Sequence, residues 1–249
     1  MEYLLIGSLV GSSLALTGSG GALLAIPLLI FFFDFPLKTA NFFSLIIVSL
    51  AALIGVMSDL KKVKMKESLL IVCGSFFGSY LSLGLKSELS EKFIFVLLSL
   101  VYFTSLYLVW RPIKNQGLSY QKEIPAYYQI LVGLILGILS TLTGLGGGVL
   151  LLPLFISLFG MDEHSAVGTS LVTIFLSSII SFILQTSGQS TYPALSSLLL
   201  IVVGVVFANV LVKRLIKVFS TSTVSRTRKV TYSLIVVYTL VSISIREFA

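Results

Sequence analysis

Long apolar runs without a charged residue recur along the whole chain. Six of them hold 16 to 20 residues, close to the roughly 20 helical residues that cross the apolar core of a bilayer. The alternation of polar and apolar positions that marks a membrane β-barrel is absent, so helices are the remaining way to satisfy backbone hydrogen bonds in lipid. The pattern therefore predicts an all-α integral membrane protein. The six runs are residues 39–58, 68–85, 93–110, 165–184, 193–212 and 230–245.

Two further apolar regions are interrupted by glycines. The first covers residues 3–33 around a break at 17–21, and the second covers residues 127–159 around a break at 143–148. The arms beside each break have about 12 to 16 residues, or roughly 18–24 Å of helix, which is short of a bilayer core about 30 Å thick. Each region is therefore either one long broken span or a re-entrant hairpin that returns to its starting side.

The same pattern occurs twice in the chain. Residues 5–55 align with residues 131–181 at a constant offset of 126 without a gap. The matched positions include glycine, threonine and proline, for example Pro27 with Pro153, and not only the common leucine. The same offset places Gly78 on Gly204, so we expect the duplication to extend into the next span. Two repeats, 1–124 and 125–249, are predicted to form one integrated membrane domain.

The distribution of lysine and arginine decides between the two arrangements of the broken regions. Cytoplasmic loops of membrane proteins are enriched in these residues. With hairpins, 13 of the 17 fall on one side and four on the other, whereas single broken spans give eight and nine. Hairpins leave three crossings per half, an odd number, so the halves are inverted. The predicted fold is thus two inverted repeats, each a glycine-broken re-entrant helical hairpin plus three transmembrane helices, a plan typical of secondary transporters.

Composition supports this interpretation and narrows the partners. Hydrophobic residues make up 56% of the chain and charged residues 11%, whereas soluble domains carry about a quarter charged residues. The net charge of +7 does not indicate nucleic acid, because the basic residues flank the spans as topology signals. The N-terminal apolar run lacks a preceding basic region and a small-residue cleavage site, so we expect it to be part of the structure. We predict a multi-pass protein of the cytoplasmic (inner) membrane, and an oligomer is compatible with the sequence.

Catalytic and metal-binding chemistry finds little support in the sequence. All ten carboxylates lie in loops or at span ends, and His164 and Cys73 are the only histidine and cysteine. An enzyme would need a nucleophile with a base, or clustered ligands, so we predict neither enzymatic activity nor a metal or cofactor. His164 is interpreted as an interfacial or capping group and Cys73 as a packing residue. The uncharged polar residues Asn41, Asn209 and Gln185 are costly in lipid and are expected to face protein or a pathway.

The glycine breaks are the candidate binding elements. Broken backbone in a membrane is tolerated only where it is buried in protein or lines a wet cavity. Glycine permits the turn and the close approach of a ligand, and the helix that follows points its positive end at the break. Because no lysine or arginine lies inside a span, an anion would be met by dipoles and neutral donors. The candidate residues are Thr17, Ser19, Gly20 and Gly21 in the first break and Thr143, Gly146, Gly147 and Gly148 in the second.

Other glycines within ordinary spans have a different interpretation. The pairs Gly74-x-x-x-Gly78 and Gly204-x-x-x-Ala208 are expected to allow close helix packing, as small residues do in membranes.

The sequence resembles the TauE/SafE family, also called the sulfite exporter or TSUP family. The resemblance rests on the duplicated glycine break followed by proline, at 17–27 and 143–153, and on Ala166-Val167-Gly168-Thr169-Ser170 before the next span. It covers essentially the full chain and implies transport of small sulfur-containing anions such as sulfite or sulfonates, with export expected. Import, a permease for another small organic anion, and a non-transporting scaffold remain alternatives. The candidate binding residues then also include Asn41, Ser44, Thr169 and Ser170.

Overall fold

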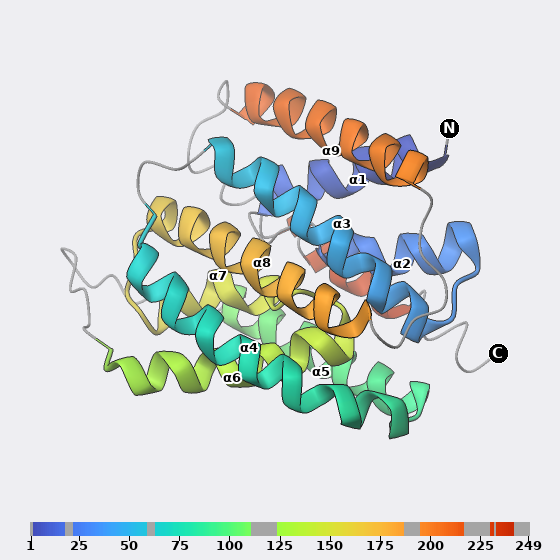
Figure 1. Cartoon of the computed structure of the whole chain (residues 1–249). Helices are drawn as coiled ribbons and strands as arrows, with labels where there is room; N and C mark the ends of the chain where they lie inside the picture. Colours follow the sequence, from blue (N-terminus) through green and yellow to red (C-terminus); the bar gives the residue numbers. More distant parts are fainter. Residues whose placement is uncertain are drawn as a thin grey trace.

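The computed structural model describes residues 2–17, 22–58, 63–110, 124–186, 195–216, 230–231 and 233–241. This part of the chain is helical, as predicted, and Figure 1 shows its helices gathered into one bundle. The first half contributes α1 (Glu2–Thr17), α2 (Ala22–Phe33), α3 (Leu37–Ser58), α4 (Met65–Glu88) and α5 (Glu91–Trp110). The second half contributes α6 (Ala126–Thr143), α7 (Gly148–Ser157), α8 (Glu163–Thr186) and α9 (Leu195–Ile216), followed by helical residues within 230–241.

Five helical segments in the described residues are long and apolar enough to cross a membrane. Four of them correspond to predicted runs, while the fifth is α6, with 18 residues before the second break. The predicted run at 193–212 is found in α9, and the run at 230–245 is described only in part. The five segments are Leu37–Met57, Met65–Leu85, Glu91–Trp110, Ala126–Thr143 and His164–Thr186.

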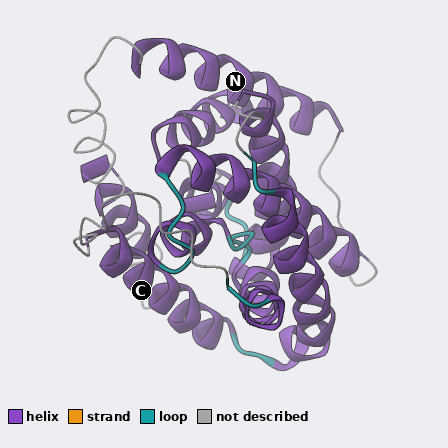
Figure 2. Ribbon diagram, turned by 90° about the vertical axis from the view of Figure 1, so that its left-hand side faces the viewer, coloured by secondary structure: helices purple, strands orange, loops and turns teal. Residues whose placement is uncertain are grey.

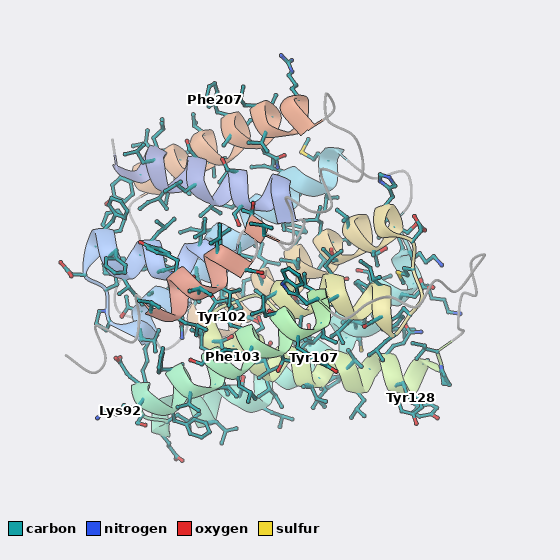
Figure 3. All side chains as sticks on the ribbon, turned by 180° about the vertical axis from the view of Figure 1, so that it is seen from behind. Lys92, Tyr102, Phe103, Tyr107, Tyr128 and Phe207 are labelled. Carbon is teal, nitrogen blue, oxygen red and sulfur yellow. The ribbon has the colours of Figure 1, made fainter. Side chains whose placement is uncertain are left out.

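Large apolar side chains cover the outside of the bundle. On α5, Tyr102 is fully buried, whereas Phe103 and Tyr107 are 60% and 66% exposed. Phe207 on α9 is 66% exposed as well, and Figure 3 shows it projecting away from the other helices. Soluble monomers rarely expose such extensive apolar surface. This surface fits the lipid environment that the sequence predicts.

The first glycine-broken region doubles back on itself. Tyr3 at the start of α1 stacks on Phe33 at the end of α2, with ring centroids 4.8 Å apart. A single broken span would place these residues at opposite ends. The two arms therefore form the hairpin that the distribution of basic residues predicts.

The second broken region returns in the same way. Helix α4 runs parallel to α6, because Ile71 faces Gly133 and Ser75 faces Gly137 one turn later. It also runs parallel to α8, since Ser68 accepts a hydrogen bond from Thr173 and Ser79 bonds with Ser181. Helices α6 and α8 thus begin at the same end of the bundle. The chain between them, through the break and α7, must return to that end.

Helices α3 and α8, which follow the two hairpins, lie side by side in the middle of the bundle (Figure 1). Phe42 near the start of α3 stacks on Phe182 near the end of α8, with centroids 4.8 Å apart. At the other end, the Lys64 N–H donates to Thr169 Oγ1 at 3.0 Å. The two helices are therefore antiparallel, as inverted repeats require. The orientation of the halves in the membrane stays a prediction.

Glycines allow helices of the two halves to pack closely against each other. A Cβ at Gly74 would overlap the Ile130 carbonyl oxygen, and one at Gly78 would overlap that of Leu134. Gly204 meets the backbone of Leu4 in the same manner. The packing interpretation of these glycines is therefore confirmed, and α4 packs on α6 of the other half just as α9 packs on α1.

The contacts correct the repeat register in these helices. Gly74 lies against residues 130 and 134, and Gly204 lies against residues 4 and 8, which are their counterparts at the offset of 126. Gly74, and not Gly78, is therefore the equivalent of Gly204, and α4 matches α9 at an offset of 130. The prediction that paired Gly78 with Gly204 was wrong. Four added residues before α9 make slightly more than one helical turn, so a glycine still matches a glycine when the two sequences are aligned at the offset of 126.

The hairpin topology predicts which loops face the cytoplasm. In a Cys73→Ser background, the single variants Lys62→Cys, Lys114→Cys and Arg226→Cys should resist an impermeant thiol reagent applied outside intact cells and react after permeabilisation. Ser90→Cys, in the loop between α4 and α5, should react in intact cells and serves as the control. Reaction of Arg226→Cys alone among the three would support a single broken span in the second half.

Candidate functional site

The second break is built on glycines with left-handed backbone. Helix α6 ends at Thr143, and Gly144 follows with a φ of 72°. Gly146 and Gly147 have φ values of 62° and 70°, and Gly147 is the N-cap of α7. Residues with a Cβ rarely adopt this conformation. The glycines are therefore required by the turn itself.

The break is buried, yet it leaves backbone donors unused. Residues 140–153 are all buried, and Figure 2 shows loop backbone enclosed by helices at the centre of the bundle. Gly144 N–H donates to Ser140 O at 2.8 Å, and Gly148 N–H donates to Leu145 O at 3.2 Å. No hydrogen bond in the described chain uses the N–H groups of Leu145, Gly146 and Gly147. Buried N–H groups without an acceptor are rare, and consecutive ones form concavities that bind anions.

Helix α3 of the first half closes one side of this break. Asn41 Nδ2 donates to Leu142 O at 3.1 Å, and Ser44 Oγ donates to Gly144 O at 2.6 Å. Because Leu142 O can only accept, the orientation of the amide is fixed. Asn41 Oδ1 is then buried without a partner among the residues that the structure describes. The site therefore contains a free acceptor as well as free donors.

Helix α8 closes the other side. Ser177 Oγ donates to Gly146 O at 3.2 Å. Ser178 Oγ is fully buried and has no partner in the described part of the chain. It lies so close to Gly146 that a Cβ there would overlap it. Val48 of α3 lies beside it, at 3.2 Å from the same Cβ position. The break and the two helices beside it thus contain three N–H groups, the Ser178 hydroxyl and the Asn41 amide oxygen, all uncharged and all without a partner in the described chain.

The structure brings some of the predicted residues together at this break. Asn41, Ser44, Gly146, Gly147 and Gly148 all lie here. Thr143 is present too, but its hydroxyl donates to Leu139 O at 2.6 Å within its own helix. Its proton is therefore engaged, in contrast to the donor role expected of it.

Other predicted residues lie elsewhere. Thr169 Oγ1 accepts the Lys64 N–H near the start of α8. Ser170 Oγ donates to Val167 O at 2.9 Å, the bond equivalent to that of Ser44 with Asn41 O. Of the first break, Thr17 ends α1 but its side chain is outside the described part of the structure, as are Ser19, Gly20 and Gly21.

Ser178 was not among the predicted site residues, and the sequence gives only an indirect signal for it. Polar residues recur at every fourth position along α8, and they are buried. This stripe faces α4 and α6 through hydrogen bonds such as Thr173 to Ser68 and Ser79 with Ser181. Ser178 adjoins it, turned toward the break. The residues of this stripe are Ser165, Thr169, Thr173, Ser177, Ser181 and Gln185. Five of the equivalent positions in α3 hold Thr39, Phe43, Ile47, Ala51 and Gly55, so α3 does not repeat the polar stripe.

Comparison with known proteins places the chain in a family. Residues 3–243 match the family described as "Sulfite exporter TauE/SafE". Bacillus subtilis (strain 168) holds similar proteins: Probable membrane transporter protein YjnA is 28% identical over 216 residues, 80% of this chain and 85% of its own length. YdhB is 25% identical over 183 residues (70% and 74%) and YunE 27% over 200 residues (70% and 73%); both carry the same description. No solved structure matches. Since the match spans nearly the whole chain, this protein belongs to the TauE/SafE sulfite exporter family, a family of membrane transporters and not of enzymes.

Proposed function

We propose that this transporter carries small sulfur-containing anions, such as sulfite or a sulfonate, outward across the cytoplasmic membrane and binds them at the second break. The observation that carries the proposal is the set of buried, unused N–H groups of Leu145, Gly146 and Gly147. The positive end of α7 points at the same place. The description of the family as sulfite exporters supports the choice of anion.

The neutral character of the site suits a ligand that must be released again. A buried lysine or arginine would hold an anion through a full opposite charge, whereas N–H groups and the Ser178 hydroxyl replace part of its hydration shell. Asn41 Oδ1 is a hydrogen-bond acceptor, so it would repel an oxygen of the anion that carries no proton. An anion that retains an O–H, such as hydrogensulfite, would donate to this oxygen and satisfy it.

Export agrees with the electrical driving force. An anion leaving a cell with a negative interior gains about 2.3 kcal/mol per charge per 100 mV. The predicted spans contain no carboxylate, and proton-coupled transporters usually keep a titratable group on the pathway. We therefore expect transport driven by the membrane potential and the gradient of the anion, with no obligatory sodium.

Radiolabelled sulfite uptake into proteoliposomes tests this proposal. The rate should follow a potassium–valinomycin potential that is positive inside the vesicle, and it should not change when sodium is replaced by choline. A strict requirement for a sodium or proton gradient at zero potential would contradict the potential-driven mechanism. Uptake of other organic anions without sulfite would support the permease alternative, and absence of transport across a panel of anions would support the scaffold.

A further inference from the structure

Another buried polar side chain lies on α9, a helix that does not enclose the second break. Asn209 on α9 is 1% exposed, and among the described residues neither its Nδ2 nor its Oδ1 has a hydrogen-bond partner. An unsatisfied amide is unfavourable in any interior. In a transmembrane helix it is the kind of residue that marks a ligand pathway.

Helix packing places Asn209 beside the end of α1. Helices α9 and α1 are parallel, because Gly7 meets Ile201 and Gly11 meets Val205. Asn209 is one turn beyond Val205, level with the last turn of α1, which ends at Thr17. Helix α9 also packs on α3. Asn209 therefore lies beside the C-terminal part of α1, as Ser79 lies beside the C-terminal part of α6.

The equivalent position in the other half is fully satisfied. At the corrected offset of 130, Asn209 corresponds to Ser79, whose Oγ is 2.8 Å from Ser181 Oγ and 3.3 Å from Gly137 O. At the offset of 126, Ser181 corresponds to Gly55. One half thus pairs two serines, whereas the equivalent positions in the other half hold a larger amide, Asn209, and a glycine, Gly55. The exchange roughly conserves side-chain volume but removes the partner of the polar group.

We propose that Asn209 is a second hydrogen-bonding position for the transported anion, located in the first half of the protein. Nδ2 donates to an oxygen of the anion, and Oδ1 accepts from the O–H of a protonated anion or from a water molecule that accompanies it. The proposal rests on the transport function proposed above. It gives a function to a buried amide that no atom of the described residues satisfies.

The Asn209→Leu variant tests the proposal, because leucine has the same number and branching of side-chain heavy atoms as asparagine and no polar atom. In detergent, its melting temperature should rise by a few degrees, since an unsatisfied amide has been removed. In proteoliposomes, sulfite transport per folded protein should fall about tenfold or more, as expected for a lost hydrogen bond to a charged ligand. Stabilisation together with loss of transport is not the signature of a packing residue.

Ser79→Ala at the equivalent position is the matched control. It breaks a satisfied pair, so its melting temperature should fall while transport per folded protein stays near that of the wild type. The proposal is wrong if Asn209→Leu transports normally. It is also wrong if this variant melts at a lower temperature and its transport falls only in proportion to the amount of protein that has unfolded. Wild-type protein that moves no anion would overturn the proposed function and this inference with it, whereas wild-type transport with an unaffected Asn209→Leu variant overturns the inference alone.

Discussion

Gly146→Ala is expected to reduce sulfite transport by about a hundredfold, while Gly147→Ala stays within roughly tenfold of the wild type. Both glycines have a positive φ, so alanine imposes a similar backbone strain of about 1–2 kcal/mol at either position. Only the Cβ at Gly146 would overlap Ser178 Oγ, whereas the Cβ at Gly147 has ordinary contacts with Leu136 and Leu151 at 3.7 and 3.8 Å. The difference between the variants therefore measures the obstruction of the site and not the strain.

Initial rates in proteoliposomes, normalised to folded protein, check this expectation. Ser178→Ala supplies a further comparison, because it removes an unpartnered hydroxyl. This variant should lose roughly tenfold in transport without any loss of thermal stability. Equal transport by Gly146→Ala and Gly147→Ala would place the binding site away from the second break.

Gly78→Ala is expected to lower the melting temperature by on the order of 10 °C, through overpacking that costs about 1–3 kcal/mol or more. Its Cβ would overlap the Leu134 carbonyl oxygen, and backbone cannot move aside as a flexible side chain can. Because α4 belongs to the first half and α6 to the second, the added methyl group would push the two halves apart at a point of close packing.

Gly84→Ala in the same helix is the matched control. A Cβ at Gly84 meets nothing within 4 Å, and alanine favours the helix over glycine by up to about 1 kcal/mol. The melting temperature in detergent is measured from the amount of protein that still elutes in the folded peak of a size-exclusion column after heating. It should be unchanged or higher for Gly84→Ala. Similar melting of the two variants would mean that helix propensity, and not the α4–α6 contact, dominates at these glycines.

Much of the architecture could be predicted from the sequence. Crossing helices follow from the length of uncharged runs, because lipid leaves the backbone no other partner. The breaks follow from consecutive glycines, which a helix does not tolerate without a reason. The charge of the loops favours hairpins, and the stacking of Tyr3 on Phe33 agrees with that interpretation. These signals are local, so a single sequence contains them.

The composition of the site was predicted only in part. Gly146 and Gly147 follow from the break itself, and Asn41 stands out as a polar residue in an apolar span. That Asn41 and Ser44 reach Leu142 and Gly144 of the opposite half has no local signal. A contact between residues about a hundred positions apart depends on which helices become neighbours.

The pairing of the helices and the register between them are visible only in the tertiary structure. Lipid is as apolar as the protein interior, so a transmembrane helix shows little contrast between its buried and exposed faces. For this reason the stripe on α8 did not reveal Ser178 as a neighbour of Gly146. The four-residue shift of α9 was not visible in the sequence either, so Asn209 could not be recognised as the counterpart of Ser79. Local sequence signals are thus sufficient to predict a membrane protein of two glycine-broken repeats, whereas helix packing decides which polar groups of the described residues have no partner.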